Sequence, residues 1–131
     1  MWFKNIILYR LSEQFTLTPE QLHDKLYSDL SRSCGKMEKT TFGWIPPLGK
    51  EHELLVHAIN GNYLIAAKKE EKILPTTVIR DHVAEKIAQI EAAESRQVGA
   101  REKRNLMDEM SITLLPQAFT KSSTLYAYID T

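Results

Sequence analysis

Nucleophilic catalysis is the most specific chemistry that this sequence could carry, with Cys34 as the nucleophile and His57 or His82 as its base. No nucleophile signature surrounds Cys34, however, and a small residue at the end of a helix explains this cysteine better. The acidic pairs Glu70-Glu71 and Asp108-Glu109 are adjacent in sequence, which favours a solvated surface over general acid–base work. We therefore expect a protein that is not an enzyme.

Metal and phosphate-loop motifs are also missing from the sequence. The four histidines show no His-x-x-x-His spacing, and the single cysteine forms no Cys-x-x-Cys motif, so zinc binding is not expected. No glycine-rich loop that would cradle a nucleotide phosphate is present. We expect neither a metal nor another cofactor.

Two local clusters of basic residues are more informative than the net charge, which is formally zero. One cluster follows a predicted strand and the other lies between two predicted helices; the candidate residues are Lys68, Lys69, Lys72, Arg80, Arg96, Arg101, Lys103 and Arg104. Such clusters can neutralise DNA phosphates and release counterions without a basic chain overall. A solvated connection between helices is the plainer explanation of the same residues.

Phe119 is a candidate for a different role, because it lies between a helix stopped by Pro116 and a polar segment. An aromatic residue in such a loop either folds back into the core or projects outward as an anchor of an interface. A protein-interaction or self-assembly domain that does not bind DNA on its own is therefore the alternative function. Basic residues on a concave face free of carboxylates would favour DNA binding, whereas interspersed Glu70, Glu102 and Asp108 would favour assembly.

Apolar periodicity and turn residues predict the elements that position these side chains. Strands are expected over Trp2–Leu11, residues 41–45, Leu54–Ile59, Asn62 to about Lys69, and Thr124–Asp130. Asn60-Gly61 predicts a type I′ hairpin turn between the third and fourth of them. Helices are expected from Pro19 to about Leu30, from Thr76 to about Ser95, and from about Ala100 to Leu115.

The first of these helices has the clearest start signal in the sequence. Thr18 is a good N-cap, Pro19 suits the first helical position, and Gln21 completes a capping box. The resulting order is β-α-β-β-β-α-α-β. It predicts an α+β fold, with a mostly antiparallel sheet, a central hairpin and helices on one face, in a single domain spanning residues 1–131.

Composition and length bound the class of protein. The chain has 131 residues, of which 43% are hydrophobic and 26% charged, which is typical of a folded globular domain. One cysteine cannot form an internal disulfide, and the first residues lack the pattern of a signal peptide. No apolar run approaches the length of a membrane span. We expect a cytoplasmic protein with no membrane association.

Five phrases, in this order and spacing, resemble the N-terminal part of the RdgC family of bacterial recombination-associated proteins. They are Trp2-Phe3-Lys4-Asn5, residues 43–49, residues 68–75, Leu114 to Phe119, and Ile129-Asp130-Thr131. The resemblance covers the whole chain, while members of the family are much longer. By this resemblance, we expect the chain to correspond to the first part of such a longer protein.

The resemblance implies a nucleoid-associated protein without catalytic activity. It implies a ring-shaped homodimer that encircles double-stranded DNA with little sequence preference and restrains RecA-driven strand exchange. By the same similarity, basic residues near Arg96 would face the hole of the ring. Phe119 matches an aromatic residue that helps to close the ring at the dimer interface.

Overall fold

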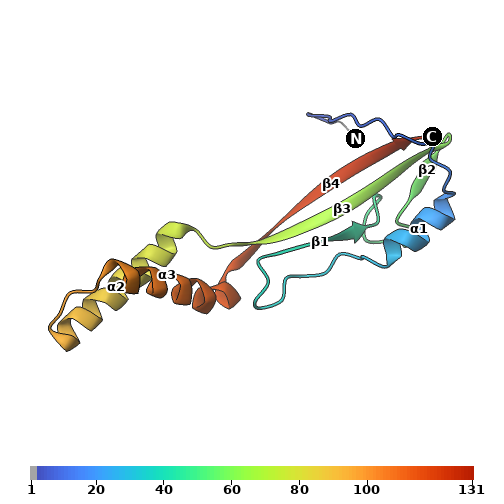
Figure 1. The fold of residues 1–131 in the computed structure, drawn as a ribbon. Helices are drawn as coiled ribbons and strands as arrows, with labels where there is room; N and C mark the ends of the chain where they lie inside the picture. The colour runs from blue at the N-terminus through green and yellow to red at the C-terminus, as the bar shows by residue number, and fades with distance from the viewer. Residues whose placement is uncertain (1–2) are drawn as a thin grey trace. The chain divides into compact units, whose positions relative to one another are not determined.

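A computed structural model describes residues 3–131, which form three α-helices, a short 3₁₀ helix and four strands (Figure 1). In chain order these are α1 (Pro19–Tyr27), β1 (Thr40–Ile45), β2 (His57–Ile59), β3 (Asn62–Ile73), α2 (Thr76–Glu94), α3 (Ala100–Leu114), η1 (Leu115–Gln117) and β4 (Phe119–Asp130). The predicted α+β class is confirmed. The observed order matches the predicted one after its first strand.

The four strands form one open antiparallel sheet in which β3 is the central strand. β3 pairs with β1, β2 and β4. The hairpin joins β2 to β3 in the register His57↔Leu64, Ala58↔Tyr63 and Ile59↔Asn62. Asn60 and Gly61 have φ angles of 50° and 81°, as a type I′ turn requires, so the predicted hairpin is confirmed.

The predicted strand over Trp2–Leu11 is wrong for Phe3–Leu11, and Trp2 lies outside the described residues. Phe3–Leu11 forms no strand, and its apolar side chains are exposed, with Leu8 90% and Tyr9 84% accessible. The β-propensity of a segment reflects packing against neighbouring strands and a covering face. Within residues 3–131 this segment has neither, so its pattern alone does not produce a strand.

Helix α1 begins as its sequence predicts. The Thr18 hydroxyl accepts a hydrogen bond from the Gln21 amide at 3.2 Å, and the Gln21 side chain accepts one from the Thr18 amide at 3.0 Å. The helix ends at Tyr27 instead of about Leu30. Leu30 has left the helix and forms an isolated parallel bridge with Trp44 of β1.

Backbone contacts divide the chain into two compact units. Unit 1 comprises residues 1–30, 44–66 and 126–131, and unit 2 comprises residues 31–43 and 67–125. The prediction of a single domain stays a prediction. Strands β1, β3 and β4 each have residues in both units.

The core of unit 1 lies between α1 and the sheet. Its buried residues are Leu22, Leu26, Leu55, Val56 and Ile65, and the partly buried Trp44, Tyr63 and Ile129 pack against them. Leu22 and Leu26 are one helical turn apart and present a single apolar face. This is the arrangement expected for a helix that covers a face of a sheet.

The core of unit 2 lies within the helical hairpin of α2 and α3. Ile79 and Val83 of α2 are buried with Val98 and Leu106, and the partly buried residues packed on them come from Leu74, α2 and α3. Ser95 ends α2 in the left-handed conformation with φ 49°. No strand residue belongs to this cluster, so the two long helices bury their apolar faces against each other.

Three strand boundaries differ from the predicted ones. β2 is limited to His57–Ile59, whereas β3 continues to Ile73 and β4 begins at Phe119 instead of Thr124. The polar residues 120–123 belong to β4 because β3 offers a partner along this length. Backbone pairing with β3 therefore makes β4 longer than the segment whose alternating apolar residues predicted a strand.

Candidate nucleic-acid interface

All eight basic residues proposed from the sequence lie in unit 2. Lys68, Lys69 and Lys72 are on β3, and Arg80 is on α2. Arg96 lies in the connection between the two long helices; Arg101, Lys103 and Arg104 follow on α3. The two clusters therefore differ in their surroundings.

The β3 cluster is largely neutralised by neighbouring carboxylates. Lys68 Nζ lies 3.3 Å from Glu70 Oε1, and Lys69 Nζ lies 3.4 Å from Glu71 Oε2. Residues two apart on a strand share a face, which is why both pairs form. Only the Lys69–Glu71 pair is well exposed, so these lysines offer less free positive charge than their sequence suggested.

Glu70 is buried, with 8% of its surface accessible, and its carboxylate joins three segments of unit 2. Its pKa is lowered first by the hydrogen bond that the Cys34 amide donates to Oε2 at 3.2 Å, and then by Lys68. The Ser122 side chain on β4 lowers the pKa of Glu70 further. Glu70 therefore stays ionised and keeps the positive charge of Lys68 compensated.

Lys72 has a structural role. Its ammonium donates to the carbonyl oxygen of Lys36 at 3.0 Å and to that of Leu115 at 2.9 Å. Neither contact neutralises the charge. The side chain is nevertheless held by backbone groups, which limits its freedom to follow a ligand.

Arg96 is clamped by two carboxylates. Its Nη1 and Nη2 lie 2.8 and 2.9 Å from the two oxygens of Glu102, and its Nε lies 2.5 Å from Glu94 Oε2. Glu102 first and Glu94 second raise the pKa of the guanidinium. The resemblance implies a DNA-facing role for this region, whereas Arg96 ties the end of α2 to the start of α3.

Four of the eight candidate cations remain exposed without an ion-pair partner among residues 3–131. They are Arg80, Arg101, Lys103 and Arg104. Arg101 lies in the first turn of α3, where the helix dipole disfavours a cation, and Lys103 and Arg104 follow it along the helix.

Carboxylates and cations are thus partly interspersed. Glu70 and Glu102 each form an ion pair with one candidate cation, as expected for an assembly surface. The four exposed cations on α2 and α3 have no such partner, and their gathering on one concave face stays a prediction. Sequence reasoning passed over four further exposed lysines of unit 2, namely Lys36, Lys39, Lys86 and Lys121, because none lies in a run of basic residues.

The formal charge is unevenly divided between the two units. Unit 2 holds thirteen Lys and Arg against ten Asp and Glu, which gives +3. Unit 1 holds four against seven, which gives −3 and restores the net charge of zero. A division of the sequence into halves hides this difference, because each unit is assembled from separate segments.

Phe119 begins β4 instead of lying in a loop, and 85% of its surface is exposed. It does not fold back into either apolar cluster. Of the two placements considered from the sequence, the outward one is observed.

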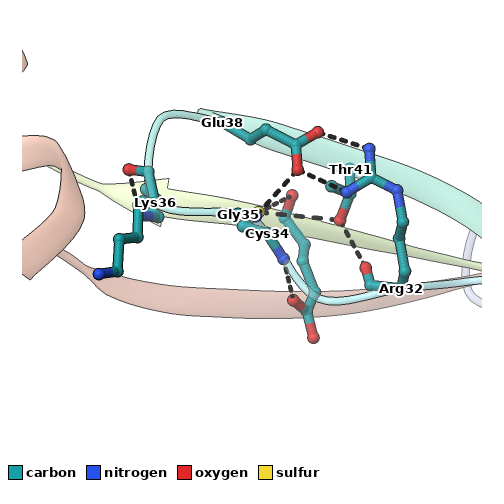
Figure 2. Close-up of polar contacts among 8 residues, drawn as sticks. Arg32, Cys34, Gly35, Lys36, Glu38 and Thr41 are labelled. Carbon is teal, nitrogen blue, oxygen red and sulfur yellow. Dashed lines mark hydrogen bonds and ion pairs between the residues drawn. The ribbon is translucent and has the colours of Figure 1, made fainter.

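Cys34 lies in the loop between α1 and β1, where its thiol donates to the Glu70 carbonyl oxygen at 3.5 Å and contacts the Thr41 hydroxyl at 3.7 Å (Figure 2). The His82 ring nitrogen instead pairs with the Val78 carbonyl oxygen. Neither His57 nor His82 forms a hydrogen bond with Cys34 in the part of the chain that the structure describes. The arrangement gives no support to Cys34 as an activated nucleophile.

No three His, Cys, Asp or Glu side chains converge as a metal site within residues 3–131. Over the same residues, no helix is long and apolar enough to cross a membrane.

Comparison with known proteins identifies the family. The family model described as "Putative exonuclease, RdgC" matches residues 1–131. Three curated relatives named recombination-associated protein RdgC come from Tolumonas auensis, Aeromonas hydrophila and Salmonella paratyphi B. Their sequences are 47%, 43% and 41% identical to this chain, over 99%, 99% and 100% of its length respectively. The chain spans 43% of the length of each. The resemblance carried by the five sequence phrases is thereby confirmed, and the chain belongs to the RdgC family.

Proposed function

We propose that this chain is a non-catalytic module that binds double-stranded DNA without sequence preference. The observation that carries the proposal is the excess of positive charge in unit 2, which contains all eight candidate cations and leaves four of them unpaired. Lysine and arginine contacts to phosphates supply sequence-independent affinity. The names of the relatives, which associate them with recombination, are in keeping with a DNA partner.

The salt dependence of duplex binding tests this proposal. The triple variant Arg101→Ala/Lys103→Ala/Arg104→Ala should reduce the slope of log K against log [salt] by up to about 3. A matched control, Arg10→Ala/Lys25→Ala/Lys50→Ala, removes the same charge from unit 1 and should leave the slope unchanged. Two unrelated duplexes of equal length should bind equally well. Equal effects of both triple variants, or binding indifferent to salt, would contradict the proposal.

A non-catalytic role differs from the description of the family model, which names an exonuclease. The described residues contain no cluster of three metal-ligating side chains, which metal-assisted phosphodiester cleavage would use. We expect an end-labelled duplex incubated with the chain and Mg²⁺ to release no labelled nucleotides. Release that depends on the protein would overturn this part of the proposal.

Self-assembly is the second candidate, and exposed apolar side chains on β4 favour it. Phe119 and Leu125 on β4 are exposed by 85% and 58%. A homodimer that covers these residues should lose affinity in the variant Phe119→Ser, as measured by sedimentation velocity. An unchanged sedimentation profile would remove this candidate.

The two candidates join in a single role proposed for the longer family members. A homodimer that occupies duplex DNA would obstruct access by RecA and thereby restrain strand exchange. Such a protein would be nucleoid-associated in the cytoplasm. The present chain would contribute its positively charged unit 2 and Phe119 to that assembly.

A further inference from the structure

The loop between α1 and β1, residues 31–39, is held in one conformation by its own side chains (Figure 2). Arg32 Nη1 and Nη2 each donate to one oxygen of Glu38 at 2.5 Å. The Gly35 amide donates to Glu38 Oε1 at 2.9 Å. Glu38 therefore links both ends of the loop to its middle, and these contacts hold the pKa of its carboxyl at about 2.

Three further hydrogen bonds fasten the same loop to the strands of unit 2. The Thr41 hydroxyl donates to the Arg32 carbonyl oxygen at 2.8 Å, and the Cys34 amide donates to Glu70 at 3.2 Å. The Lys72 ammonium donates to the Lys36 carbonyl oxygen at 3.0 Å. Surface loops are usually the mobile parts of a fold, so this degree of bracing requires an explanation.

The braced loop presents two free ammonium groups to solvent. Lys36 and Lys39 are exposed, and neither has a carboxylate partner among residues 3–131. Glu38 is the single acidic residue of the loop sequence, and its carboxylate is already occupied by Arg32. The loop therefore combines uncompensated positive charge with a fixed backbone.

The positive charge of unit 2 is concentrated in its strand portion, defined here as residues 31–43, 67–73 and 115–125. This portion has seven Lys and Arg against three Glu, a formal charge of +4. The helical residues 74–114 have six against seven, a formal charge of −1. All three Glu of the strand portion, Glu38, Glu70 and Glu71, already form ion pairs.

We propose that loop 31–39 is a preorganised phosphate-binding element, in which Lys36 and Lys39 contact the DNA backbone and the Arg32–Glu38 pair positions them. This inference rests on the proposed function and assigns part of its surface. It adds two contacts that lie outside the eight candidates. A loop already fixed in its bound conformation loses little conformational entropy on binding, so bracing strengthens the contacts.

Two variants separate contact from positioning. Lys36→Ala/Lys39→Ala removes both ammonium groups and should lower the salt slope of duplex binding by about 1–2. Glu38→Gln removes a negative charge, so electrostatics alone would strengthen binding. We expect it instead to weaken binding severalfold, without a lower salt slope, because the loop loses its brace. The control Lys25→Ala/Lys50→Ala, in unit 1, should bind like the unmodified chain.

The outcomes distinguish this inference from the function on which it rests. If the unmodified chain fails to bind duplex DNA even at low salt, the proposed function and the loop assignment are both overturned. If the chain binds and the Arg101/Lys103/Arg104 variant lowers the slope, but the lysine double variant does not, only the loop assignment is overturned. Tighter binding by Glu38→Gln would overturn the positioning role. Far-UV circular dichroism and urea midpoints verify that each variant is folded.

Discussion

The ammonium of Lys72 on β3 lies 2.9 Å from the carbonyl oxygen of Leu115, which is the C-cap residue of α3. This carbonyl is at the negative end of the helix dipole, where a cation is favourable. The same ammonium holds the Lys36 carbonyl oxygen. Lys72 therefore links the helical hairpin, the central strand and loop 31–39 within unit 2.

Removing the ammonium of Lys72 should destabilise unit 2. Lys72→Met keeps most of the aliphatic stem but loses two charge-assisted hydrogen bonds, so we expect the free energy of unfolding to fall by about 1–2 kcal/mol. The control Lys69→Met breaks an exposed pair with Glu71 and should cost less than about 0.5 kcal/mol. Urea unfolding measures both. Equal losses would show that Lys72 has no special structural role.

The Glu38 carboxyl should titrate well below an ordinary glutamate. Arg32 first and the Gly35 amide second lower its pKa to about 2. Because the folded-state pKa is depressed, the stabilising contribution is complete above about pH 4.5. It is lost as the pH falls toward 2. The Gly35 amide resonance, followed by NMR against pH, should show a midpoint near 2, and a midpoint near 4.3 would contradict the brace.

The capping box of α1 should contribute measurably to unit 1. Thr18→Ala removes the acceptor for the Gln21 amide, so we expect a loss of about 1 kcal/mol in the free energy of unfolding. Thr16→Ala makes the same chemical change at an exposed position two residues earlier and should have little effect. Thermal melting of the two variants provides the comparison. Matching melting temperatures would refute the contribution of the cap.

The helical hairpin should depend on the apolar cluster that α2 and α3 share. Val83 is 4% exposed, and Val83→Ala should reduce the free energy of unfolding by about 2 kcal/mol. Val78 on the same helix is 38% exposed, and the same substitution there should cost less than about 0.5 kcal/mol. Denaturant midpoints measure the difference. Comparable midpoints would mean that the cluster does not stabilise the hairpin.

Features that depend on neighbouring residues were predictable from the sequence. The capping box at Thr18 and the turn at Asn60-Gly61 are encoded within four residues, and both form as predicted. Features that depend on a distant partner were not predictable. Phe3–Leu11 has the pattern of a strand but no partner within residues 3–131, whereas β4 exceeds its apolar pattern because β3 pairs with it.

The candidate site shows the same division. The basic clusters were visible in the sequence because their members are close together along the chain. The neutralisation of Lys68 by a buried Glu70, and the tie between Cys34 and Glu70 across 36 residues, required the fold. Loop 31–39 could not be identified from the sequence, because the charges of Lys36 and Lys39 are uncompensated only when Glu38 pairs with Arg32.

The opposite charges of the two units also affect how the chain behaves in concentrated solution. With a sequence pI of about 6.9, molecules near neutral pH carry almost no net charge to keep them apart. The +3 unit of one molecule then attracts the −3 unit of another. Moderate salt weakens this attraction and should raise solubility near neutral pH. Association through exposed apolar strand residues would instead increase as salt is added. Buffer choice during purification will therefore reveal which of the two forces governs colloidal behaviour.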